Sequence, residues 1–141
     1  TTLTLAKSLG VGNDGVGQLA IQQGARVILT GAYAEPNFTE YGLCEVGVNA
    51  GATGTVAVDG VGSALLGTQG FLNVGFLTGG HLTVTNGAVV DFAAMNVGGA
   101  QNGSSSVTIS GAGSVVRVTD SLGIGAPFPG PAATEATVSC A

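Results

Sequence analysis

The sequence has few charged residues, and very few of these are basic. Charged residues make up 8% of the 141 residues, the basic ones are Lys7, Arg26 and Arg117, and the formal net charge is −5. Proteins that bind nucleic acid cluster Lys and Arg against the phosphates. We therefore expect no nucleic-acid partner and no affinity for an anionic membrane surface. The sequence also lacks an apolar run of about 18 residues, which a membrane-spanning helix requires, so we expect no membrane insertion.

Cysteine and histidine are also scarce. The chain has two cysteines, Cys44 and Cys140, without CxxC spacing, and one histidine, His81. Disulfide scaffolds and zinc sites need more of these residues at short spacings, so we expect no disulfide framework, no metal and no cofactor. The opening Thr1–Thr4 lacks the basic and apolar regions of a signal peptide, which predicts a mature or excised segment.

Glycine and small aliphatic residues are abundant instead. The chain has 26 glycines, and 45% of its residues are hydrophobic. The glycines follow no three-residue period, which excludes collagen, and the low charge argues against disorder.

The sequence repeats itself. Residues 46–63 and 97–114 match position by position without a gap, shorter copies run over 11–27 and 74–90, and a degraded copy runs over 124–139. Long and short forms alternate, which indicates duplication of a two-repeat unit.

Each copy contains three strand-like pieces. The first pieces are 9–11, 44–46, 72–74, 95–97 and 122–124, and the second are 19–21, 56–58, 82–84, 107–109 and 136–138. The third follows a glycine-containing corner, as at Val116–Val118. Period-2 alternation places one set of side chains inside and the other outside, and glycines supply the positive φ angles of sharp corners.

A short repeat of this kind cannot bury its own apolar face, but stacked repeats can. We therefore predict one all-β domain over 1–141, a right-handed β-solenoid (β-helix) of about five coils with three short strands per coil and little or no helix. A β-sandwich is the rival architecture, and the fixed period with matching corner glycines favours the solenoid.

The repeat resembles a known family of sequences. Residues 46–63 read Val-Gly-x-x-x-Gly-x-x-Gly-Thr-Val-x-Val-x-Gly-x-Gly-Ser, which is similar to the repeat of autotransporter passenger domains and PEP-CTERM-associated exported proteins of Gram-negative bacteria. The resemblance implies an exported β-solenoid at or beyond the cell surface, and it carries no catalytic residues.

The two ends of the chain are in matching repeat phase. Residues 1–12 align with 114–125, and residues 136–141 align with 107–112, so that one position, that of Gly113, separates one chain's end from the next chain's start. Open solenoid ends are normally capped, and we see no cap, so we predict head-to-tail assembly with a second copy. A fragment cut from a longer passenger is the alternative. The predicted assembly interface comprises Thr1, Thr2, Leu3, Leu5, Ala136, Val138, Cys140 and Ala141.

Two segments break the repeat, an insertion loop at 30–43 and a Pro-rich loop at 126–133. Aromatic residues are enriched in interfaces, so the loops predict either a lateral contact surface or a lid over the side of the solenoid. The lateral-contact residues are Tyr33, Phe38, Tyr41 and Phe128.

The cysteines take different positions in the repeat. Cys44 occupies an inward apolar position, which predicts a buried thiol, and Cys140 occupies the position of the corner residue Gly111. Within one chain they are too far apart for a disulfide. A bond from Cys140 to Cys44 of the next copy is a hypothesis that depends on assembly.

Few residues suggest chemistry. His81 stands just before a predicted strand, as a solvated corner residue would. Gly12–Gly15 is only partly similar to a calcium-binding nonapeptide, so we expect no calcium site. Glycosidase chemistry needs converging carboxylates, and we expect no such pair and no enzyme. The scattered carboxylates are Asp14, Asp59, Asp91 and Asp120.

The outward-facing residues in and just after the second strand-like pieces suggest a further binding surface. A Thr-rich face could bind ice or a regular polysaccharide, although Asp59 and Gln22 interrupt it. The two rows are Ala20, Ala57, Thr83, Thr108, Thr137 and Gln22, Asp59, Thr85, Ser110, Ser139.

We therefore predict a structural subunit of an extracellular filament or surface fibre, with a second copy of itself as partner. The alternative is a repeat segment of an autotransporter-type adhesin that binds host or polysaccharide surfaces. A Thr-rich face that binds ice or polysaccharide is third. The resemblance implies a location outside the cell, or on the cell surface, of a Gram-negative bacterium.

Overall fold

The computed structural model describes residues 1–32, 42–99, 103–125 and 135–141. These residues form twelve strands and no helix, which confirms the all-β prediction, and hence they contain no helix that could cross a membrane. The strands are β1 (Thr2–Leu5), β2 (Ser8–Val11), β3 (Val16–Ile21), β4 (Arg26–Leu29), β5 (Leu43–Val46), β6 (Thr53–Asp59), β7 (Ala64–Val74), β8 (Gly79–Thr85), β9 (Val89–Val97), β10 (Ser104–Ser110), β11 (Val115–Ile124) and β12 (Glu135–Cys140).

All strand pairs in the described residues are parallel. One sheet has five strands in the order β12-β10-β8-β6-β3. The other has seven strands, in which β1-β4-β7-β5-β2 form a path and β9 and β11 follow on from β7. In the described part of the chain, neither sheet closes on itself.

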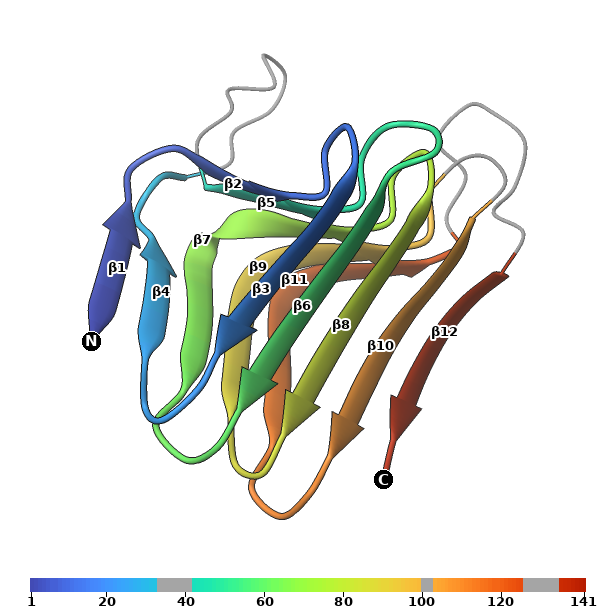
Figure 1. Ribbon diagram of the computed structural model, residues 1–141. Helices are drawn as coiled ribbons and strands as arrows, with labels where there is room; N and C mark the ends of the chain where they lie inside the picture. Colours follow the sequence, from blue (N-terminus) through green and yellow to red (C-terminus); the bar gives the residue numbers. More distant parts are fainter. Residues whose placement is uncertain (33–41, 100–102, 126–134) are drawn as a thin grey trace.

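The strands stand in three columns (Figure 1). The first column contains β1, β4 and the N-terminal parts of β7, β9 and β11. The second contains β2, β5 and the C-terminal parts of β7, β9 and β11. The third is the five-stranded sheet. The chain passes through the columns in this order five times, and we call each passage a repeat: β1–β3, β4–β6, β7–β8, β9–β10 and β11–β12.

The strand register confirms most of the sequence alignment. In the second column, Val11, Val46, Val74, Val97 and Ile124 lie side by side as one row, as the alignment of the first pieces predicts. In the third column, Leu19 pairs with Val56, and the row continues through Leu82 and Val107. We use "row" below for residues aligned in this way across a column.

The predicted register of the last strand is wrong by two residues. Val138 lies beside Val107 and Cys140 lies beside Ile109, whereas the alignment placed Cys140 at the corner position of Gly111. A two-residue shift leaves every inward side chain inward, so alternation alone cannot detect it. The shift also changes how the two ends of the chain are related in the repeat. Ala141 takes the position after Ile109, and Thr1 takes that of Ser114, so three repeat positions, 111, 112 and 113, separate the two ends instead of one.

Three strands are longer than the short pieces that we expected. β7, β9 and β11 have 11, 9 and 10 residues and run through both the first and the second column. Their register shifts between Gly67 and Phe71 and between Val118 and Ser121. Extra residues in one of two paired strands bend the sheet, and this bend forms the corner between the two columns.

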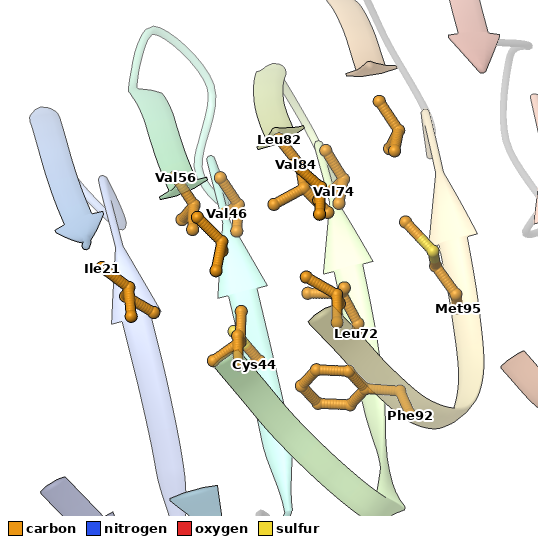
Figure 2. Packing of buried hydrophobic residues seen from close by; sticks show 14 of the residues in the cluster. Ile21, Cys44, Val46, Val56, Leu72, Val74, Leu82, Val84, Phe92 and Met95 are labelled. Carbon is orange, nitrogen blue, oxygen red and sulfur yellow. The ribbon is translucent and has the colours of Figure 1, made fainter. Parts of the chain in front are cut away.

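Inward rows from all three columns meet in one hydrophobic core (Figure 2). Val58 and Val84 from the third column and Val46 and Val74 from the second are fully buried, and Phe92 contributes the largest buried side chain. Burying an aliphatic side chain of this size stabilises a fold by about 1.5–3 kcal/mol. Most of the largest fully buried side chains lie in the second to fourth repeats.

Glycine is required where the third column begins. A Cβ at Gly54 would collide with the main-chain N of Gly47 and the main-chain O of Val11. A Cβ at Gly80 would collide with the main-chain N of Gly75 in the same way. Only glycine lets the backbone segments of a corner approach this closely.

Candidate functional site

A cavity of about 430 Å³ opens at the C-terminal end of the stack. Its lining is mostly apolar and comes from the last two repeats. The lining residues are Met95, Val107, Ile109, Val116, Val118, Asp120, Ser121, Leu122, Val138 and Cys140. In the inner repeats, the inward side chains of these rows are covered by those of the next strand along the stack.

Exposure of the rows rises sharply at this end. Leu122 and Ile124 are 52% and 49% exposed, whereas their row neighbours Met95 and Val97 are 3% and 0% exposed. Within the described residues, β11 and β12 pair with a neighbour on one side only. The outer edge of each strand therefore presents main-chain N–H and C=O groups beside uncovered apolar side chains, a combination that promotes strand addition.

The N-terminal end of the stack has the same character. β1, β2 and β3 likewise pair on one side only within the described chain. Leu3 is 50% exposed, whereas its row neighbour Val27 is 6% exposed. Leu9 and Leu19 are half-buried. Within the residues that the structure describes, both ends of the stack are thus uncovered cross-sections of one apolar core.

The residues predicted for assembly divide between these two ends. Thr1, Thr2, Leu3 and Leu5 lie on or beside β1, and Ala136, Val138, Cys140 and Ala141 lie on or beside β12, at the opposite end of the stack (Figure 1). Sequence reasoning missed other residues of the same two edges. Extending each inward row to its first and last member would have found them. They are Leu9, Leu19, Val116, Leu122 and Ile124.

The two cysteines lie in different surroundings. Cys44 is 0% exposed, as predicted, and its burial raises the thiol pKa to about 12, with a further contribution from the Glu45 carboxylate. Cys140 is exposed and lies in the row of Ile109 at the mouth of the cavity. In a stacked second copy, Cys44 would lie in the second column of the second repeat, whereas Cys140 lies in the third column. The offset along the stack alone would be two strand spacings, or about 9.6 Å. A disulfide needs Cα atoms within about 6.8 Å, so this geometry argues against the Cys140–Cys44 bond.

The predicted lateral-contact residues Tyr33, Phe38, Tyr41 and Phe128 lie outside the described residues. The same is true of most of the 30–43 and 126–133 loops.

The prediction of a solvated corner for His81 is wrong. His81 lies within β8, is half-buried, and its Nδ1 is 2.9 Å from Oγ of Ser106 on the neighbouring strand β10. The described part of the chain brings together no three His, Cys, Asp or Glu side chains that could hold a metal ion.

The carboxylates near the chain termini are far apart in the structure. Asp14, in the corner after β2, accepts a 2.5 Å hydrogen bond from Nδ2 of Asn49 in the next repeat. Asp120 lies at the other end of the stack and lines the cavity. Asp14 therefore joins two successive corners of the stack.

The two remaining aspartates each join neighbouring repeats. Asp59 accepts hydrogen bonds from Oγ1 of Thr85 at 2.6 Å and Nδ2 of Asn86 at 2.7 Å, and these bonds hold the pKa of its carboxyl below the usual value. Asp91 forms a 2.7 Å ion pair with Arg117. These contacts hold neighbouring repeats together.

The Thr-rich face is shorter than predicted. The outward row reads Ala20, Ala57, Thr83, Thr108 and Ser139. Thr137 lies instead in the row of Ser106 and His81, because of the corrected register of β12. This row therefore contains only two adjacent threonines.

Comparison with known proteins finds no matching family model, no similar curated protein and no similar solved structure.

Proposed function

We propose that this chain is a right-handed β-solenoid of about five coils that acts as a structural subunit and polymerises head-to-tail into an extracellular filament or surface fibre. One observation carries the proposal: the two ends of the stack expose strand edges and apolar rows in the same column order.

The strand pairing supports the solenoid. Each repeat pairs in parallel with the preceding and the following repeat, and each visits the three columns in the same order. A β-sandwich such as the immunoglobulin fold has antiparallel sheets, so the parallel pairing argues against the rival architecture. In a solenoid, every repeat needs a neighbour to cover its apolar interior.

A second copy can supply that neighbour at the open end. If its β1, β2 and β3 continue the first, second and third columns, Leu3 stacks on Val116 and Leu9 stacks on Leu122. In the third column, Leu19 stacks on Val138. These pairs follow from the rows that run through each column. The contact would bury apolar side chains and give hydrogen-bond partners to the main-chain groups of both edges.

This contact joins two different surfaces, so it does not close on itself. Heterologous contacts without a closing rotation generate filaments. Strands in a sheet are spaced by about 4.8 Å, so each subunit of five repeats would add about 24 Å to the length of the filament.

The test is electron microscopy and sedimentation velocity of the 141-residue chain over a wide concentration range. We expect fibres for the parent chain, and single particles for Leu122→Lys, which places a charge on the open end. Val61→Lys is the matched control, because Val61 is 84% exposed but lies in the corner between the second and third repeats. Single-copy particles at every concentration would overturn the proposal, as would normal fibres of Leu122→Lys.

The same open ends support a second candidate. Repeats that adjoin this segment covalently would cover the ends equally well, as in an adhesin-type passenger that binds host or polysaccharide surfaces. The intact mass of the protein isolated from its source separates the two: a mass well above the 13.5 kDa of this chain favours the passenger.

One observation supports a non-enzymatic role: the carboxylates Asp14, Asp59 and Asp91 are each engaged in contacts between repeats. The Thr-rich row, with two adjacent threonines, is too short to favour an ice-binding face. The resemblance of the repeat motif supports a location at or beyond the surface of a Gram-negative cell, where a polysaccharide could be a further partner.

A further inference from the structure

The corner between the first and second columns differs in length from repeat to repeat. One residue separates Phe92 from Ala94 in the fourth repeat, three separate Gly67 from Phe71 in the third, and the second repeat carries the long insertion. Only the first and last repeats have corners of the same length, each with two residues. These are Ala6-Lys7 and Thr119-Asp120.

The two equal corners belong to the two ends of the stack. Leu5 and Ser8 flank the first, and Val118 and Ser121 flank the last. Ser8 and Ser121 share a row, and Leu5 and Val118 each come directly after a residue of one other shared row, that of Thr4 and Arg117. If a second copy continues the columns, its first corner stacks on the last corner of the first copy, residue beside residue. Lys7 of one copy then lies directly beside Asp120 of the other, one strand spacing or about 4.8 Å away along the backbone.

The charges at this position are opposite. Lys7 is one of only three basic residues in a chain with a net charge of −5. Both side chains are exposed, and Asp120 also lines the cavity at the C-terminal end. An ammonium and a carboxylate in adjacent positions of two stacked corners, one strand spacing apart, are within reach of an ion pair.

We propose that Lys7 of one copy pairs with Asp120 of the next and sets the polarity of the assembly, an inference that rests on the proposed head-to-tail function. A head-to-head contact brings no Asp120 to Lys7, and a tail-to-tail contact brings no Lys7 to Asp120. Only the head-to-tail contact therefore forms this attractive pair. Because the pair is exposed, salt weakens it.

Charge reversal tests the pair. Lys7→Glu places Glu beside Asp120, and Asp120→Lys places Lys beside Lys7, so each variant should have a critical concentration about threefold to tenfold above that of the parent. The double variant Lys7→Glu/Asp120→Lys restores an attractive pair and should return to the parent value. Arg26→Glu is the matched control, since it changes the net charge as Lys7→Glu does, but Arg26 is an exposed residue of β4, which already pairs with β1 on one side and β7 on the other.

A mixing experiment sharpens the test. Each single variant repels itself, but the N-terminal end of either one is complementary to the C-terminal end of the other. An equimolar mixture should therefore polymerise as readily as the parent, with the two variants alternating along the fibre, which differently sized tags can show in electron micrographs.

The outcomes separate this inference from the proposed function. If the parent chain forms no fibres, the head-to-tail function itself fails. If the parent forms fibres and the two single variants, alone and mixed, polymerise like the parent and like Arg26→Glu, the function stands and the pairing of Lys7 with Asp120 is wrong. Recovery in the mixture but not in either single variant supports the pair.

Discussion

Phe92 has the largest buried side chain of the core, and its neighbour in the same row, Gly67, has no side chain. Phe92 on β9 is 1% exposed and lies beside Gly67 on β7. A Cβ at Gly67 would overlap the ring at Cε1 and also approach its Cδ1 at 2.8 Å. The aromatic ring therefore occupies the space that a side chain on the neighbouring strand would fill.

This arrangement predicts a strong coupling between the two positions. Gly67→Ala alone should destabilise the chain by about 1–3 kcal/mol, because a packed core cannot yield to an added methyl group. Phe92→Leu alone should cost about 1–2 kcal/mol through lost burial and a small cavity. In the Phe92→Leu background, Gly67→Ala should cost nothing or stabilise by up to about 1 kcal/mol, because alanine loses less backbone entropy than glycine on folding.

The measurement is a double-mutant cycle of urea unfolding, followed by far-UV circular dichroism because the chain has no Trp. Dilute protein should be used, so that assembly does not add to stability. Gly15→Ala is the control, since a Cβ there meets nothing within 4 Å, and its effect should be the same in both backgrounds. A cost of Gly67→Ala that does not change when Phe92 is replaced would show that the two positions are not coupled.

Three further predictions concern single positions. Gly54→Ala should destabilise by about 3 kcal/mol or more, because its Cβ would meet main-chain atoms that cannot move aside; a urea midpoint equal to that of Gly15→Ala would contradict this. Asp59→Asn should have a lower free energy of unfolding than the parent at neutral pH. This difference should narrow as the pH falls below 3.8, because the hydrogen bonds that lower the pKa of Asp59 favour the folded state only while its carboxyl is ionised. A difference that does not change with pH would count against the Thr85 bond. A thiol reagent at mildly alkaline pH should modify Cys140 alone in the folded chain, since the pKa of Cys44 is about 12; rapid reaction of both thiols would show that Cys44 is accessible.

Much of the architecture could be predicted from local pattern. Alternation and the recurring glycines placed Val46, Val74 and Val97 in one row, and the strand register confirms it. They also placed Cys44 in an inward position, where the structure buries it completely. These predictions succeed because a repeat confronts each strand with nearly the same neighbours, so that the pattern of one copy describes the next.

The candidate site was predicted only in part. β1 and β12 were expected at the ends, but the contributions of Leu122 and Ile124 depend on how the second column terminates. His81 was assigned to a corner and lies within β8, where Ser106 of the next strand contacts its ring. A contact between repeats of this kind cannot be derived from the spacing within one repeat.

The all-β class, the five repeats and the inward or outward side of most strand residues could be predicted from the amino-acid sequence, because they depend on a two-residue period and on glycines that recur along the chain. The register of β12, the bends within β7 and β9, and the fit of Phe92 over Gly67 became clear only from the folded chain. Alternation is unchanged by a shift of two residues, so register depends on the size of the side chains that meet across neighbouring strands, which only the assembled core defines.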